Sequence, residues 1–260
     1  MTEGVGMGDS HAFWDVILPE LLGLFGVWTK PTLKLSPRQK AGTLFAMRSM
    51  RRLLAVDGLF RSGYYLESHV LVRAGYEDWV CLAYLLREPG DARCEVFTEA
   101  IHKQDARVYD AFAALCGSDV AERYFVGMPE AVRAFTGLPR SHTRPISLAA
   151  MADDVGLRKV HDFVYSYLSG LSHPDARLTH VFDQSDAVPV ARIPARNLED
   201  ETRLALWLAW FTSRIAVRAN CEFGVDHEPF VEEHLLPFLT RTGLNIETCV
   251  LVREGHDEAP

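Results

Sequence analysis

Apolar residues recur at helical spacing along nearly the whole chain, which predicts an all-α protein. The clearest helix start lies at Ser36, because Pro37 follows in the first turn and Gln39 completes a capping box. The stretch from Trp79 to Leu86 is apolar on every side, which predicts a central, buried helix. We expect helices over 12–25, 36–60, 64–87, 91–116, 118–127, 148–155, 157–171, 198–223 and 229–240.

The connections between these helices are short, which favours antiparallel neighbours and a single multi-helix bundle over residues 11–252. The alternation in 179–183 and 188–193 is compatible with a small β-hairpin between the last long helices, although two prolines weaken it. Residues 1–10 are acidic and glycine-rich, and residues 253–260 form an acidic tail. We expect the N-terminal segment to be disordered and the tail to be flexible.

Composition places the chain among ordinary globular proteins, with 48% hydrophobic and 24% charged residues. The net charge of −8 argues against a surface coated with phosphate-binding groups, but a local basic patch remains compatible with it. One such patch is formed by Arg48, Arg51 and Arg52. A run of this kind is usually a solvated helix face, and the alternative is a surface that attracts RNA or another anion.

Five widely spaced cysteines form no C-x-x-C pair, so neither a structural zinc site nor a disulfide framework is indicated. The N-terminus lacks the basic start and apolar run of a signal peptide. The most apolar stretch, Leu204 to Val217, is interrupted by Arg214 and is too short to cross a bilayer. We therefore expect a cytoplasmic protein with reduced thiols and no membrane contact.

The helix predicted over 64–87 carries the most informative polar residues. His69, Arg73, Glu77 and Tyr84 fall on one of its faces, next to the apolar stretch. Arg73 and Glu77 are one turn apart and are expected in or beside the core. One interpretation is a structural salt bridge. The other is a polar site in which Arg73 holds an anion and Glu77 orients it.

A second group of polar residues marks the end of the helix predicted over 157–171: Tyr165, Ser169, His173 and Asp175. A histidine just beyond a helix C-terminus is stabilised in its charged form by the helix dipole, which is one sufficient role for His173. The alternative is a general acid–base or a phosphate ligand, because its pKa lies near neutrality. Since the histidines lack compact metal spacing and no glycine-rich phosphate loop occurs, we predict no metal and no cofactor.

Two stretches resemble a bacterial family of helical proteins of unknown function. The similarity covers 50–86 and 157–175 and implies no established reaction. The matching residues are Arg61-Ser62-Gly63-Tyr64-Tyr65, Leu71-Val72-Arg73-Ala74-Gly75-Tyr76-Glu77, and the spacing Tyr165, Leu168, Ser169, His173.

More distantly, a helical bundle with a histidine ending a late helix is similar to the HEPN superfamily. Many of its members are metal-independent ribonucleases of toxin–antitoxin and phage-defence systems, with an arginine four to six residues before the histidine. Tyr167, Leu168 and Ser169 stand at those positions here. The resemblance therefore favours a HEPN-like binding module for RNA, a nucleotide or a protein partner, in stress or phage defence.

Two alternatives stay open beside the binding module. In the first, the protein is a ribonuclease or nucleotide-processing enzyme in which Arg73 replaces the missing arginine and His173 transfers a proton, with Glu77 in the same site. In the second, these polar residues only hold the fold together. A homodimer is among the partners that the sequence allows.

Overall fold

The computed structural model describes residues 10–25, 34–138, 146–172, 198–241, 244–245 and 250–251. The predicted hairpin around 179–193, the N-terminal nine residues and the predicted acidic tail lie outside these ranges. Within them the chain is all-α apart from one pair of two-residue strands near the C-terminus, which confirms the predicted fold class.

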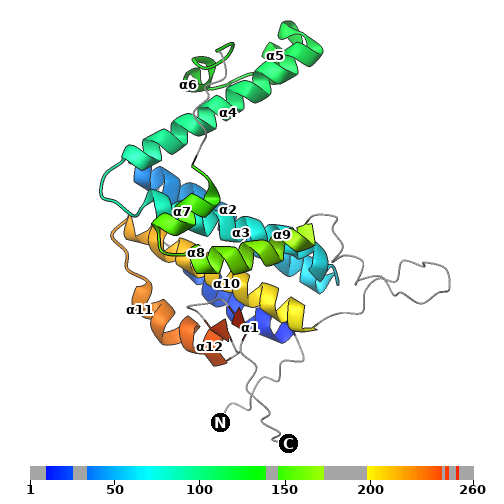
Figure 1. Cartoon of the computed structure of the whole chain (residues 1–260), viewed down its shortest axis with the longest axis vertical. Coiled ribbons are helices and arrows are strands. Elements are labelled where there is room, and N and C mark those ends of the chain that lie inside the picture. The colour runs from blue at the N-terminus through cyan, green and yellow to red at the C-terminus, as the bar shows by residue number, and fades with distance from the viewer. Residues whose placement is uncertain are drawn as a thin grey trace, which may run out of the picture.

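Three long helices form the centre of the bundle: α2 (Pro37–Arg61), α3 (Tyr65–Leu85) and α10 (Leu198–Cys221). Each of them contacts the other two, and α1 (Ser10–Gly23) packs against α10 and α2 (Figure 1). The predicted bundle of long helices is thus present, and α3 lies within it as its apolar stretch predicts.

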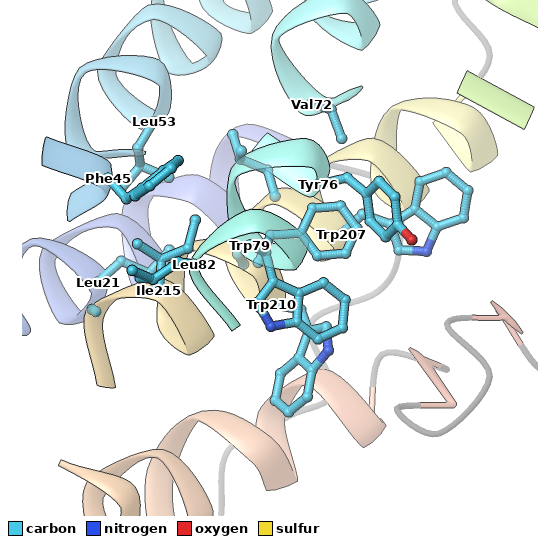
Figure 2. Packing of buried hydrophobic residues seen from close by; sticks show 14 of the residues in the cluster. Leu21, Phe45, Leu53, Val72, Tyr76, Trp79, Leu82, Trp207, Trp210 and Ile215 are labelled. Atoms are coloured by element: carbon cyan, nitrogen blue, oxygen red, sulfur yellow. The ribbon is translucent and has the colours of Figure 1, made fainter. Parts of the chain in front are cut away.

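The core combines aliphatic side chains with a group of aromatic rings from α3 and α10 (Figure 2). The rings of Trp79 and Phe211 stack with centroids 5.3 Å apart, and Trp207 is fully buried. Helices α2 and α10 approach closely at Gly42, where an added Cβ would lie only 3.3 Å from the Cα of Ala219. Residues 204–217 are almost entirely buried, so this stretch is a core helix and offers no exposed apolar patch.

The capping box predicted at the start of α2 is confirmed. The Ser36 hydroxyl accepts a hydrogen bond from the Gln39 amide at 3.2 Å, and the Gln39 side chain accepts one from the Ser36 amide at 3.1 Å. Asp91 stands at the N-cap position of the helix that begins at Ala92, but its side chain makes no capping bond to that helix. Its carboxylate instead accepts a hydrogen bond from the backbone amide of Arg38 on α2, at 3.3 Å.

Two segments predicted as single helices contain a π-helical turn. The first consists of α8 (Arg158–Val160), η2 (His161–Tyr165) and α9 (Ser166–Ser172). The second consists of α11 (Glu228–Phe230), η4 (Val231–Leu235) and α12 (Leu236–Arg241). A π-helical turn shifts the face on which the following residues lie, and such turns occur frequently at functional sites. After α12, the strands β1 (Leu244–Asn245) and β2 (Val250–Leu251) pair antiparallel.

Residues 92–138 form an arm that extends away from the bundle (Figure 1). At its base Cys94 is buried and the Phe97 ring lies 5.7 Å from that of Phe45 on α2. Further out, Tyr109, Phe112 and neighbouring aromatic rings form a small cluster of their own. The arm comprises α4 (Ala92–Cys116), α5 (Ser118–Tyr124) and α6 (Glu130–Arg133), and α7 (Leu148–Asp154) packs back against α3.

No helix within the described ranges is long and apolar enough to cross a membrane.

Candidate functional site

Helix α3 lies beside the segment formed by η2 and α9, and polar side chains line the contact between them. The Tyr76 hydroxyl is hydrogen-bonded to His161. Arg73, one turn before Tyr76 on α3, is hydrogen-bonded to Tyr165, which comes after His161 in the chain. The two segments therefore run antiparallel. We call this contact, with Glu77 at its edge, the α3–α9 seam.

Arg73 is held in the seam by two neighbours. Its Nε donates to Glu77 at 3.0 Å, and its Nη2 donates to the Tyr165 hydroxyl at 2.7 Å. The Arg73 side chain is 19% exposed and that of Glu77 is 40% exposed. Arg73 therefore lies beside the core as predicted, whereas Glu77 is more open to solvent than predicted.

The Tyr165 ring contacts two other side chains of the seam. The guanidinium carbon of Arg73 lies 4.7 Å from the ring centroid, and the His161 ring stacks on it with centroids 4.8 Å apart. His161 and Tyr165 are the first and last residues of the π-helical turn, so this turn places both side chains in the seam. Tyr165 thus lies in the seam, where its hydroxyl accepts the hydrogen bond from Arg73.

His161 is a site residue that sequence reasoning missed as a member of this cluster. It is only 7% exposed, and its Nδ1 lies 3.2 Å from the Tyr76 hydroxyl. Burial lowers the pKa of His161, so the neutral imidazole is favoured at neutral pH. The spacing of four residues between His161 and Tyr165 is visible in the sequence, but only the contact with α3 shows that both side chains lie in the seam.

The other predicted site residues divide into three groups. His69 lies one turn before Arg73, and Ser169 lies one turn after Tyr165, so the antiparallel arrangement places both toward the same end of the seam. The Ser169 hydroxyl is buried and has no hydrogen-bond partner among the described residues. His173 and Asp175 lie outside the described ranges.

Tyr84 does not belong to the seam, although it was predicted to share the face of Arg73 and Glu77. It lies seven residues beyond Glu77, which is about 10 Å along the helix axis. There the guanidinium of Arg93 lies over its ring at 4.1 Å, and Arg93 also donates to its backbone carbonyl at 2.9 Å. Tyr84 thus supports the base of the arm.

The model of a family of unknown function, DUF5677, matches residues 39–188. The chain belongs to this family. The match covers α2, α3, the arm and the segment from α7 to α9, and it therefore includes both stretches in which the sequence resembles an uncharacterised helical family. No curated protein and no solved structure matches the chain.

A second cluster of charges in this DUF5677 protein lies on another face of α3, toward α2. Asp78 is 4% exposed, and it pairs with Arg52 and, at 3.2 Å, with Arg48 on α2. Burial raises the pKa of Asp78 and outweighs the opposite effect of the two arginines. The interpretation of the arginine run as a solvated face is therefore wrong for Arg52, because its charge is needed to compensate a buried carboxylate. Arg48 and Arg51 are exposed, and Arg51 makes no ion pair with a described residue.

The chemistry available in the DUF5677 seam is that of an oriented guanidinium beside a carboxylate and two tyrosines. The nearby thiol of Cys81 offers no nucleophile, because burial raises its pKa to about 12. Across the described part of the chain, no group of three histidine, cysteine or acidic side chains is arranged to hold a metal ion. The arrangement is suited to holding an anion through Arg73.

Proposed function

We propose that this DUF5677 protein is a HEPN-like helical binding module that holds a small phosphate-bearing ligand, such as a nucleotide, at Arg73. The supporting observation is the arrangement of the guanidinium. Two of its nitrogens are engaged by Glu77 and Tyr165, while Nη1 donates to no described residue. The side chain is thus oriented in advance and still has a donor for a ligand, which reduces the entropy lost on binding.

Exposure distinguishes this proposal from a purely structural role. A salt bridge that only holds helices together is expected to be sealed, as the pair of Asp78 and Arg52 is. The Arg73 and Glu77 side chains are instead 19% and 40% exposed. An exposed pair of this kind contributes little to stability, so stability alone gives a weak reason for its geometry.

A small ligand fits better than a long RNA strand. RNA binding gains most of its affinity from many phosphate contacts, whereas the seam supplies one guanidinium and the whole chain carries a net charge of −8. The Tyr165 ring, which lies beside Arg73, is already stacked on His161 and in contact with the Arg73 guanidinium, which leaves less of its surface for a base.

The proposal is tested by isothermal titration of the full chain with nucleoside mono-, di- and triphosphates and with a short single-stranded RNA. We expect binding of at least one nucleotide, lost in Arg73→Ala and weakened about tenfold or more in Arg73→Lys, which cannot reproduce the fork of donors. Arg133→Ala is the matched control, because it removes one arginine from an exposed ion pair on the arm. Unchanged affinity in Arg73→Ala would contradict the proposal.

The wild-type chain and Arg73→Ala, together with a His173→Ala variant, also test the ribonuclease alternative. RNA is incubated with the wild-type chain, Arg73→Ala and His173→Ala without added metal, and the fold of each variant is checked by circular dichroism. Cleavage by the wild type that is lost in both folded variants would replace the binding module by an enzyme in which Arg73 binds phosphate and His173 transfers the proton. Intact RNA together with nucleotide binding would favour the binding module.

A further inference from the structure

The arm carries apolar side chains that the bundle does not cover. Val108, Leu115, Tyr124 and Val126 are 50%, 83%, 72% and 81% exposed. Three of them, Val108, Tyr124 and Val126, line a depression with a cavity volume of about 370 Å³, and Asp105 also lines it. We call this surface the arm depression. Asp105 is exposed and makes no ion pair with a described residue, so the depression combines apolar walls with one uncompensated negative charge.

A surface of opposite character lies on the bundle. On α2, Leu44, Met47 and Leu54 are 40%, 53% and 48% exposed, and the exposed Arg51 lies between the last two. The spacing of three, four and three residues places all four side chains along one line of the helix, as in the seam of a coiled coil. We call this line the α2 stripe. Exposed apolar residues that occur singly are ordinary, but an aligned set beside a charge without a partner marks an interaction surface.

We propose that the α2 stripe of one copy of the chain docks into the arm depression of a second copy, and that two such contacts related by a two-fold axis form a homodimer. Charge selects the occupant, because Arg51 and Asp105 have opposite signs and neither has an ion-pair partner among the described residues. The projection of the arm away from its own bundle makes it available to another molecule (Figure 1).

The spacing of the residues agrees with an antiparallel contact between α2 and the α4 helix of the second copy. Met47 and Arg51 are one turn apart, as are Val108 and Asp105, so an apolar contact and an ion pair can form together. With Met47 opposite Val108, the same register places Leu44 opposite Ala111 and Leu54 opposite Ile101. Met47 is the side chain expected to enter the depression, since its unbranched chain adapts to irregular cavities.

Two-fold symmetry makes the association closed. Each copy has one arm and one stripe, so a reciprocal pair satisfies both surfaces on both molecules and doubles the area buried by a single contact. The ion pair gives the contact its specificity, because reversing one charge places two like charges against each other.

Sedimentation equilibrium and light scattering of the full chain test this proposal. We expect a dimer for the wild type, and we expect Arg51→Glu and Asp105→Arg each to weaken it about tenfold or more. The double variant that combines both reversals restores the opposite charges and should recover most of the affinity, which misfolding of a single variant cannot mimic. Lys159→Glu changes the net charge as Arg51→Glu does, but it lies on α8 and should leave the dimer intact.

Two outcomes would overturn the proposal. One is a wild-type chain that stays monomeric across the accessible concentration range. The other is a dimer that neither single reversal weakens, which would place the interface elsewhere. Because Arg73 lies in neither surface, nucleotide binding by a monomeric variant would leave the proposed function untouched.

Discussion

Glu77 and Asp78 are neighbours in the sequence, yet they serve two different charge clusters of the molecule. Successive side chains on a helix point about 100° apart, so Asp78 faces α2 and Glu77 faces the seam with α9. Asp78 is buried against Arg52 and Arg48, whereas the Glu77 side chain is 40% exposed beside Arg73. The comparison teaches that burial decides how costly it is to leave one member of an ion pair without its partner.

The largest expected effect is the loss of Asp78. Asp78→Ala leaves Arg52 with its charge in a mostly buried position, so we expect the free energy of unfolding to fall by about 3–5 kcal/mol. Urea denaturation measures the change. Arg52→Ala in the same background should recover part of the loss, since it removes the uncompensated charge. A loss below about 1 kcal/mol would show that the two clusters do not differ as their burial indicates.

A smaller effect is expected in the seam. Tyr165→Phe removes the hydroxyl that accepts from Arg73, which should lower the free energy of unfolding by about 1 kcal/mol and weaken nucleotide binding. Tyr167→Phe is the matched control, because the Tyr167 hydroxyl accepts from Arg203 at 2.9 Å in the same way. Equal loss of nucleotide binding in both variants would contradict a specific role for Tyr165.

The third prediction concerns pH. Because burial lowers the pKa of His161 below its ordinary 6.5, the unfolded chain takes up this proton more readily than the folded chain. The stability that His161 contributes is therefore present above pH 6.5 and is lost as the pH falls. His161→Phe keeps an aromatic ring beside Tyr165 and does not titrate. Between about pH 8 and about pH 5 the wild type should lose stability relative to this variant, and parallel curves would contradict a buried, neutral histidine.

The smallest effect is expected from Glu77→Gln. The amide oxygen still accepts from Arg73, and the lost charge is largely screened by solvent, so the free energy of unfolding should change by about 0.5 kcal/mol or less. The change is measured beside Asp78→Asn, which alters the neighbouring carboxylate in the same way. A Glu77→Gln effect as large as that of Asp78→Asn would remove the distinction between the two clusters.

Several features of the fold were predictable from local sequence. The capping box at Ser36 involves residues three positions apart, so its hydrogen bonds form wherever that helix starts. The ion pair of Arg73 and Glu77 also follows from helical spacing alone. The prediction that α3 is buried was confirmed, because a helix that is apolar on every side from Trp79 to Leu86 has no face to present to water.

The candidate site was only partly predictable. The sequence identified Arg73, Glu77 and Tyr165, but it assigned Tyr84 to the same site and did not include His161. These differences arise because a shared helix face extends over many turns, whereas a site occupies only one or two of them. Arg73 belongs to the site because its turn of α3 contacts Tyr165 of η2. Tyr84 lies further along α3, where it contacts Arg93 at the base of the arm.

The sequence by itself determined the helical class, the bounds of most helices to within a few residues and the pairs that lie one turn apart, because these depend on hydrogen bonds and spacing within a single segment. The tertiary structure alone decided that Asp78 is enclosed with Arg52, that a π-helical turn places His161 and Tyr165 against α3, and that residues 92–138 leave the bundle as an arm. The physical reason is that burial and long-range pairing depend on which helix faces pack together. Several helices of this chain have apolar faces, and the sequence of each helix alone does not specify its partner.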